Sequence, residues 1–358
     1  MASTIKDVAK LSKVSVATVS RVLNDLGGYS EETKIRVLKV VDEIGYKRNA
    51  IARSLSTNTT RTIGVILPDV STSFDGEIIR GIEDVAHDNN YSVILCNAGS
   101  KGVRTLEYLR ILEERQLDAV IIVSIKIEDE YYKALKKINI PYILISTTSP
   151  KYDMPHIKVD DLSAAYTATK YLLDRGHRKI AMISGNQDDT IAGLPRVQGY
   201  IKALSDYGIS VDENLITYGD FSYKSGIECM NTLLERKKDF TAIFIASDDM
   251  AVGVLNVAYR KKIRVPDDLS IVGYDNTKVA IMSIPPLTTL SQPLYEMGCR
   301  AFSEILNMLK LTTLSQPLYE MGCRAFSEIL NMLNGNDSKE QIIMKHNIAE
   351  RETVKWLK

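Results

Sequence analysis

A group of side chains near the N-terminus has the types and spacing needed to contact DNA bases. Val16, Ala17, Ser20 and Arg21 fall on one face of a predicted helix, away from the apolar stripe that includes Val19. Small apolar side chains approach thymine methyl groups, and an arginine donates two hydrogen bonds to guanine N7 and O6. The face therefore predicts base contact. The alternative is a helical hairpin with an ordinary solvated face.

Short helices must hold this face in place. Residues 4–24 predict two helices with Thr4 and Ser15 as N-caps, and the connection between them is so short that it predicts a helix-turn-helix. A third helix is expected at about 31–45. Residues 49–56 predict a further helix that is too short to be stable alone in water. It either folds when docked on a partner or serves as a flexible tether.

The segment TIKDVAKLSKVSVATVSRVLN, followed by NAIARSL, resembles the DNA-binding headpiece and hinge helix of the lactose-repressor (LacI/GalR) family. The resemblance implies that Val16, Ala17 and Arg21 contact bases, and that Leu55 enters the central minor-groove step and kinks the DNA. Lys13 departs from the family, which often has Gly or Asn at that turn. The predicted DNA-contacting set also contains Thr4, Ser15, Thr18, Ser20, Asn24, Asn49 and Ala52.

The rest of the chain alternates short runs rich in Val and Ile with amphipathic stretches. The runs include TIGVILPD, YSVILCNAG, AVIIVS and YILIS, and after about residue 160 KIAMISG, LITYGD, AIFIASD and SIVGYD. Continuous apolar strands between helices predict parallel sheets that are covered on both faces. The expected fold class is therefore α/β, with an all-α helix-turn-helix headpiece and two doubly wound parallel-sheet lobes.

Polar and aromatic side chains follow these strands, and ligands of such sheets bind at the carboxyl ends of the strands. Their mixture of hydroxyls, carboxylates and rings predicts a site for a small polar ligand such as a sugar. Most of these residues, taken singly, are better explained as helix caps or loop residues, and only their convergence indicates a site. The members of the predicted effector-binding set that follow strands are Phe74, Ser146, Asp160, Phe221, Ser247 and Asp275.

A second resemblance covers most of this part of the chain. VDDLSAAYTATKYLLDRGHRKIAMISG, RVQGY, ASDDMAVG and VPDDLSIVGYDN are similar to the effector domain of the same family, which is akin to periplasmic sugar-binding proteins. The resemblance implies that Arg196, Ser247 and Asp275 contact the effector, while Phe74, Asp160 and Phe221 close around it. Arg196 and Asp275 are expected to clamp ligand oxygens through charge-assisted hydrogen bonds.

The predicted boundaries divide the chain into four parts. A headpiece covers residues 1–47, and a hinge helix with its linker covers 48–61. One lobe is expected to combine residues 62–160 with 288–333. The other is expected to combine residues 161–287 with 334–358.

The chain contains one internal duplication. The segment LTTLSQPLYEMGCRAFSEILNML at 287–309 is repeated without change at 311–333. Each copy predicts a strand that ends before Gln-Pro and an amphipathic helix. The predicted fold has room for one such unit, so one copy is surplus. Because the copies are identical, sequence alone leaves open which one is seated.

Composition excludes several classes of protein. The 358 residues are 45% hydrophobic and 25% charged, which is typical of a soluble globular protein, and no apolar run is long enough to span a bilayer. Residues 1–60 carry 10 Lys/Arg and 6 Asp/Glu, so a basic head precedes a mildly acidic body. Because the N-terminus lacks an apolar signal region, a cytoplasmic location is expected.

The chain is not expected to be an enzyme, because the first predicted strand is followed by LPDVSTSFDG, with no GxGxxG or P-loop pattern. Four scattered cysteines and four scattered histidines predict no metal or cofactor. The expected partners are a pseudo-palindromic double-stranded operator, a small-molecule effector and a second copy of the chain. The expected function is a sequence-specific DNA-binding transcriptional regulator, a repressor, whose operator affinity is controlled by a small polar effector such as a sugar. The alternative function is a solute-binding protein without DNA activity.

Overall fold

The computed structural model describes residues 3–23, 25, 27–46, 59–237, 239–312, 341–344, 347–349 and 354. It divides into two compact units, residues 1–60 and 61–358. The described part of the first unit contains the helices α1 (Ile5–Ser12), α2 (Val16–Leu23) and α3 (Glu31–Glu43). Their apolar sides form a small core around Val8, Val19, Val22 and Val37. The predicted helix-turn-helix and third helix are confirmed.

The turn between α1 and α2 depends on local hydrogen bonds. Ser15 caps α2, because its hydroxyl accepts a hydrogen bond from the N–H of Thr18 at 3.0 Å. Lys13 ends α1 in a left-handed conformation, with φ of 53°. A side chain with a Cβ is strained in this conformation, as expected from the absence of Gly or Asn here.

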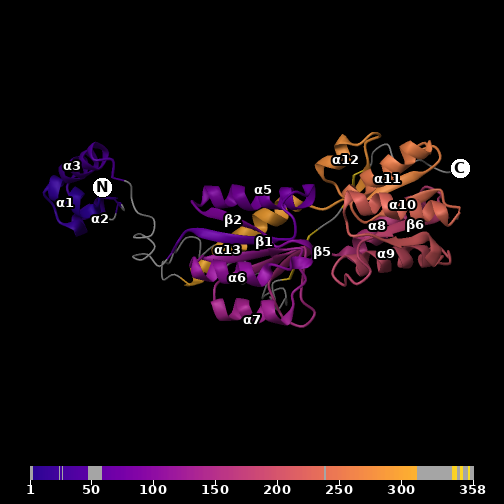
Figure 1. Cartoon of the computed structure of the whole chain (residues 1–358), viewed down its shortest axis with the longest axis horizontal. Helices are drawn as coiled ribbons and strands as arrows, with labels where there is room; N and C mark the ends of the chain where they lie inside the picture. Colours follow the sequence, from indigo (N-terminus) through magenta and orange to yellow (C-terminus); the bar gives the residue numbers. More distant parts are fainter. Residues whose placement is uncertain are drawn as a thin grey trace, which may run out of the picture. The chain divides into compact units, whose positions relative to one another are not determined.

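The second unit contains two parallel sheets with helices on both faces, and we call them lobe 1 and lobe 2 (Figure 1). In lobe 1 the strand order is β11-β5-β4-β3-β1-β2. Helices α5 and α13 cover one face and α6 and α7 the other (Figure 1). The elements of lobe 1 are β1 (Thr62–Leu67), α5 (Ser73–Asp88), β2 (Ser92–Asn97), the 3₁₀ turn Ser100–Gly102, α6 (Thr105–Glu114), β3 (Ala119–Val123), α7 (Asp129–Ile138), β4 (Tyr142–Ile145), β5 (His156–Val159), α13 (Leu294–Thr312) and β11 (Gln341–Met344).

Lobe 2 repeats this arrangement with the strand order β12-β10-β9-β8-β6-β7, in which only β12 is antiparallel to its neighbour among the described strands. Helices α8 and α9 cover one face, and α10 and α11 cover the other. The elements of lobe 2 are α8 (Asp161–Asp174), β6 (Ile180–Ser184), α9 (Gly193–Asp206), the 3₁₀ turn Glu213–Leu215, β7 (Ile216–Tyr218), α10 (Tyr223–Glu235), β8 (Ala242–Ile245), α11 (Asp248–Lys261), β9 (Ser270–Asp275), α12 (Lys278–Met282), β10 (Thr288–Ser291) and β12 (Asn347–Ala349).

The strands expected from the apolar runs are all present, but two segments belong to lobes other than the predicted ones. β10 was expected in lobe 1, whereas its four residues pair in parallel with β9 of lobe 2. β11 was expected in lobe 2, whereas it pairs with β5 of lobe 1. The chain therefore crosses between the lobes after β5, after β10 and again after β11. β11 lies at the edge of its sheet and β10 lies between β12 and β9, and in both cases the pairing supplies partners for the backbone N–H and C=O groups of the strand.

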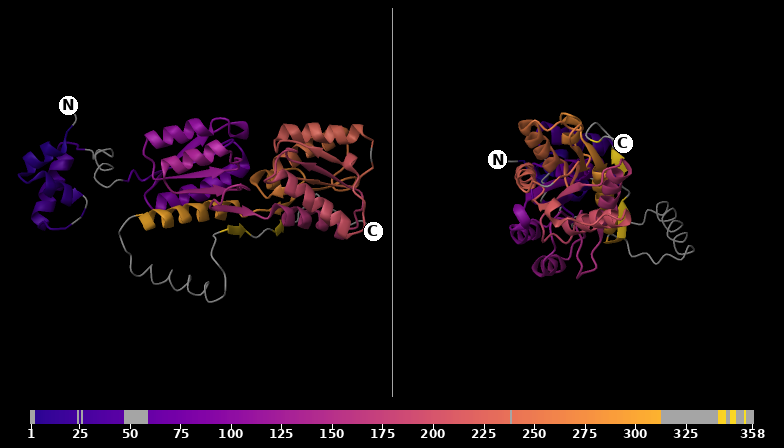
Figure 2. Two further views of the ribbon diagram at one scale, coloured as in Figure 1. Left: turned by 90° about the horizontal axis from the view of Figure 1, so that it is seen from below. Right: turned by 90° about the vertical axis from the view of Figure 1, so that its right-hand side faces the viewer.

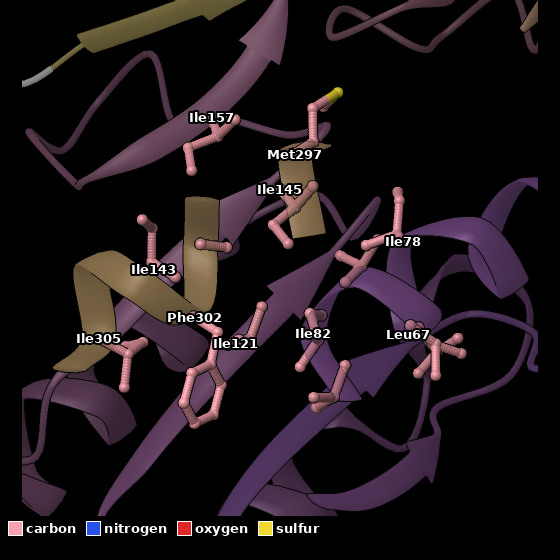
Figure 3. Packing of buried hydrophobic residues seen from close by; sticks show 14 of the residues in the cluster. Leu67, Ile78, Ile82, Ile121, Ile143, Ile145, Ile157, Met297, Phe302 and Ile305 are labelled. Carbon is pink, nitrogen blue, oxygen red and sulfur yellow. The ribbon is translucent and has the colours of Figure 1, made fainter. Parts of the chain in front are cut away.

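The first copy of the duplicated segment occupies the single predicted position. Its strand is β10, and its helix α13 lies beside α5 and buries Met297, Phe302 and Ile305 against lobe 1 (Figures 2 and 3). The helices approach closely at Gly298, where a Cβ would lie 2.1 Å from the carbonyl oxygen of Ile78. The second copy, apart from its first two residues, lies outside the described residues. In the part of the chain that is described, no helix is long and apolar enough to cross a membrane.

Candidate functional site

Helix α2 presents the predicted base-contacting face to solvent. Val16 is 42% exposed, and Ala17 and Arg21 are also exposed, whereas Val19 and Val22 on the opposite side are buried in the headpiece core. This division follows from the helical period, because residues three and four apart share one face. The exposed face therefore has the small apolar side chains and the guanidinium that major-groove contact requires.

The surroundings of this face favour the contact. Thr4 is exposed, and both its N–H and its hydroxyl donate to the carboxylate of Asp7, at 2.9 and 2.7 Å, which fixes the start of α1. Ser15 caps α2 by accepting the hydrogen bond from the N–H of Thr18, while Ser20 is half-buried. The positive end of the α2 dipole suits a DNA phosphate. Asn24, Asn49, Ala52 and Leu55 lie outside the described residues.

The predicted effector residues all lie at or just beyond the carboxyl ends of strands, or on the helix that follows. In lobe 1, Phe74 is in the first turn of α5, Ser146 follows β4, and Asp160 follows β5. The residues of lobe 2 are Arg196 in α9, Phe221 after β7, Ser247 after β8 and Asp275 at the end of β9. These are the positions at which doubly wound sheets bind ligands.

Arg196 is buried and pairs with a carboxylate outside the set predicted from the sequence. Its Nε and Nη2 each lie 2.8 Å from Oδ1 of Asp161, and its Nη1 donates to the carbonyl of Ala246 at 2.6 Å. The guanidinium carbon also lies 3.8 Å from the centre of the Tyr274 ring. Arg196 thus connects α8, α9 and the end of β8.

Asp275 is also buried and accepts a hydrogen bond from the side chain of Gln292 at 2.7 Å. Burial raises the pKa of Asp275 well above its usual range, and the charge of Arg196 opposes this effect. The expected clamp of Arg196 and Asp275 is therefore an electrostatic pair in which each side chain already has another partner. Gln292, part of the first duplicated copy, was not identified from the sequence, because its neighbour Asp275 is distant along the chain.

Asp248 forms a buried connection close to this pair. Its carboxylate accepts hydrogen bonds from the hydroxyl of Thr289 at 2.6 Å and from the N–H of Thr277 at 2.7 Å. Burial raises the pKa of Asp248 to about 7, although the bonds from Thr289 and Thr277 lower it. Since Thr289 belongs to β10, the first duplicated copy contributes to this region of lobe 2 as well as to the core of lobe 1.

Ser247 and Asp160 act as helix caps, which is the alternative role that the sequence left open. The Ser247 hydroxyl accepts from the N–H of Met250 at 3.2 Å and donates to the carbonyl of Phe221 at 3.0 Å. Asp160 accepts from the N–H of Ser163 at 3.1 Å. An effector role for Ser247 and Asp160 stays a prediction.

Three of the predicted effector residues have a backbone with positive φ. Ser146, Phe221 and Asp275 have φ values of 53°, 69° and 113°, which disfavour any residue with a Cβ. Such strain persists where the surrounding structure enforces it, and it is enriched at binding sites. The Phe221 ring also covers Gly185, where a Cβ would lie 1.9 Å from the ring.

A separate hollow of about 540 Å³ lies beside the edge strand β7 of lobe 2. It is lined by residues such as Val197, Thr217 and Arg236, and by none of the predicted effector residues. It lacks the buried ion pair and strained strand ends described above. We therefore place the candidate effector site at the strand ends and not in this hollow.

Comparison with known proteins agrees with both parts of the chain. Residues 4–49 match the family described as bacterial regulatory proteins, lacI family, and residues 60–351 match periplasmic binding proteins and sugar binding domain of LacI family. The chain belongs to the LacI family. Because this family consists of effector-controlled transcription regulators, the chain is a DNA-binding transcriptional regulator and not an enzyme.

Similar proteins cover nearly all of the chain. The HTH-type transcriptional regulator RegA of Clostridium saccharobutylicum is 38% identical over 309 residues, which is 86% of this chain and 93% of RegA. The transcriptional regulator CelR in complex with cellobiose is 28% identical, with a TM-score of 0.69 and coverage of 98% and 99% of the two chains. The lac repressor dimer bound to operator shares the fold, with 24% identity, a TM-score of 0.81 and coverage of 99% and 100%.

Proposed function

We propose that this regulator is a cytoplasmic repressor that binds a pseudo-palindromic operator as a homodimer. Binding of a sugar or related metabolite lowers or raises its affinity for the operator. The exposed face of α2 is the observation that carries the proposal. One such helix contacts only a few base pairs, so a long specific site requires two headpieces related by a two-fold axis.

Salt-dependent binding to DNA tests this function. Purified protein is titrated onto a labelled palindromic duplex taken from upstream of its own gene and onto a scrambled duplex of equal length. We expect tighter binding to the palindrome at every salt concentration, because base contacts add to the phosphate contacts that both duplexes offer. Equal affinity for the two duplexes would contradict sequence-specific regulation and favour a solute-binding protein.

Hinge insertion has its own test. By the family resemblance, Leu55 is the residue that enters the minor groove. The variant Leu55→Ala is expected to weaken specific binding and to reduce DNA bending while leaving the fold intact, because an inserted apolar side chain unstacks the step that kinks. Circular-permutation gel shifts measure the bend. A bend equal to that of the wild type would remove Leu55 from the proposal.

An exposed apolar patch supports the homodimer. The large apolar side chains of α12 and the residues just after it that are at least 60% exposed are Ile281, Met282 and Ile284. Exposed groups of this size are typical of association surfaces. In sedimentation velocity, the paired variant Met282→Lys/Ile284→Lys is expected to shift dimers to monomers. The matched variant Ile35→Lys, at another exposed apolar position, is expected to leave the dimer intact.

The buried Arg196 and the strained strand ends support an effector site that binds a small polar ligand. CelR, which is similar over nearly the whole chain, is described in complex with cellobiose. We therefore expect sugars among the effectors of this regulator. Titration of the operator complex with a panel of sugars, phosphorylated sugars and purines tests this expectation and also gives the sign of the response.

A further inference from the structure

Two carboxylates on different lobes lie at the strand-end region, and no ion pair is found for either within the described residues. Asp75 is in the first turn of α5 in lobe 1, and Asp249 is in the first turn of α11 in lobe 2. Neither belongs to the effector set predicted from the sequence. They lie in the helices that follow β1 and β8, respectively.

Asp75 is the more informative of the two, because one of its oxygens is left without a hydrogen bond. The residue is 5% exposed. Its Oδ2 accepts from the hydroxyl of Thr72 at 2.7 Å, but its Oδ1 is buried with no hydrogen-bond partner. A buried carboxyl oxygen without a donor costs free energy, and native structures rarely keep one without a reason. A ligand that donates a hydrogen bond would supply the missing partner.

The two carboxylates lie within electrostatic reach of each other. Burial is the main cause that raises the pKa of Asp75 to about 7, and the charges of Asp69 and Asp249 raise it further. The lobes also meet here: Oε1 of Glu77 in helix α5 and Nζ of Lys278 in helix α12 form an ion pair at 3.3 Å. A small ligand placed between Asp75 and Asp249 would therefore contact both lobes.

The local charges disfavour an anion in this position. The N-terminus of a helix normally attracts phosphate or carboxylate groups. In α5 that position holds Asp75, and in α11 it holds Asp248 and Asp249. The nearby cation Arg196 is already paired with Asp161. A phosphate group would thus meet carboxylates where other helix N-termini offer free N–H groups.

We propose that Asp75 and Asp249 select a sugar without anionic groups, neutral or amine-bearing, over its phosphorylated form by accepting hydrogen bonds from its hydroxyl or ammonium groups. This inference rests on the proposed sugar effector and specifies its chemical class. A ligand bonded to both carboxylates favours the arrangement in which the lobes lie together. The same contacts therefore link specificity to the conformational response.

Calorimetric titration of the full-length protein with matched ligands tests the proposal. The probes are glucose, glucosamine and glucose 6-phosphate, together with ribose and ribose 5-phosphate. In each series we expect the parent sugar or its amine to bind more tightly than the phosphate. The variant Asp75→Asn keeps the size of the side chain but loses its charge. This variant is expected to bind the ligand of highest affinity about tenfold or more weakly than the wild type, because hydrogen bonds to charged groups are stronger than those to neutral groups.

Two further variants keep the test decisive. Asp88→Asn changes an exposed carboxylate at the other end of α5 and is expected to leave every affinity unchanged. Asp249 is half-buried, so the variant Asp249→Asn is used in the same titrations if Asp75→Asn does not fold. The same weakening is expected from it.

Three results would overturn the proposal: a phosphorylated sugar that binds more tightly than its parent, unchanged affinities in both site variants, or no binding of any probe at millimolar concentration. The operator titration on the same samples separates these failures from failure of the proposed function. Intact operator binding with a phosphorylated sugar as effector would reject only the proposed ligand selection by Asp75 and Asp249, and would leave the proposed repressor function standing. Loss of specific operator binding in the wild type would reject the proposed repressor.

Discussion

The duplicated segment predicts an unusual tolerance to damage in the core of lobe 1. Phe302 of the first copy is completely buried and packs edge-on against Tyr91, with 5.7 Å between the two ring centres. Phe326 occupies the equivalent position in the second copy. Because the 23 residues are identical, the second copy carries every side chain that the first uses to fill this position. We therefore expect it to take the place of a damaged first copy.

The size of the effect follows from the packing. Truncation of a buried Phe to Ala costs about 3–5 kcal/mol when nothing replaces the ring. If both copies can be seated, removal of one of two equivalent registers costs only RT ln 2, about 0.4 kcal/mol. The difference in loop length between the two registers adds at most a few tenths of a kcal/mol, since the closure entropy changes only logarithmically. Single variants should therefore lose less than about 1 kcal/mol.

Thermal unfolding of four proteins measures this effect. Phe302→Ala and Phe326→Ala are each expected to unfold within about 2 °C of the wild type, whereas the double variant is expected to unfold roughly 6–10 °C lower. The cost of the double variant thus exceeds the sum of the single costs, which is the signature of two elements that replace each other. The variant Phe240→Ala, in lobe 2 and outside the duplication, serves as a control without a second copy.

One outcome would refute this reasoning directly. If Phe302→Ala unfolds at as low a temperature as the double variant, the second copy cannot be seated, and the register found in the structure is the only stable one.

Deletion of residues 287–310 leaves a single copy joined to the same flanking chain. We expect this deletion to raise thermal stability, reduce self-association and sharpen the effector response. Lower stability or loss of the dimer would instead show that the additional copy has a structural role.

Three further predictions concern single residues. Arg21→Ala should weaken operator binding by about 1–3 kcal/mol and relax one base position in a competition assay, whereas an equal loss on all sequences would make Arg21 a phosphate contact. Asp275→Asn should reduce the effector response with operator binding retained. Arg196→Ala should also destabilise lobe 2 in urea unfolding, but by less than the ~3–5 kcal/mol of an uncompensated buried charge, because Asp161 keeps Lys158 at 3.1 Å and the hydroxyl of Tyr274 as partners. A full effector response in both variants would place the site elsewhere. Burial raises the pKa of Asp75 from 3.8 to about 7. The stability that its protonated form contributes is therefore complete below about pH 4 and is lost as the pH rises towards 7, so Asp75→Asn should become more stable relative to wild type over that range. A stability difference that is independent of pH would contradict the burial of this carboxyl group.

Sequence by itself determined the local elements of this protein. Alternation of apolar runs and amphipathic stretches predicted the two doubly wound lobes. A hydroxyl residue before a helix predicted the cap Ser15, which accepts a hydrogen bond from the following turn. These features depend only on residues that are neighbours along the chain, so they can be predicted from the sequence without knowledge of the tertiary structure. The same holds for the exposed face of α2, since the helical period assigns each side chain to a face.

Tertiary structure decided which distant groups meet. The partner of Arg196 is Asp161, the partner of Asp275 is Gln292, and β10 and β11 join sheets other than the expected ones. In each case several candidates of the same chemical type exist along the chain, and only packing selects among them. The seated copy of the duplication is the clearest example, because two identical segments have identical local preferences. The choice between them depends on chain connectivity and on the contacts of α13 with α5, which no local pattern contains.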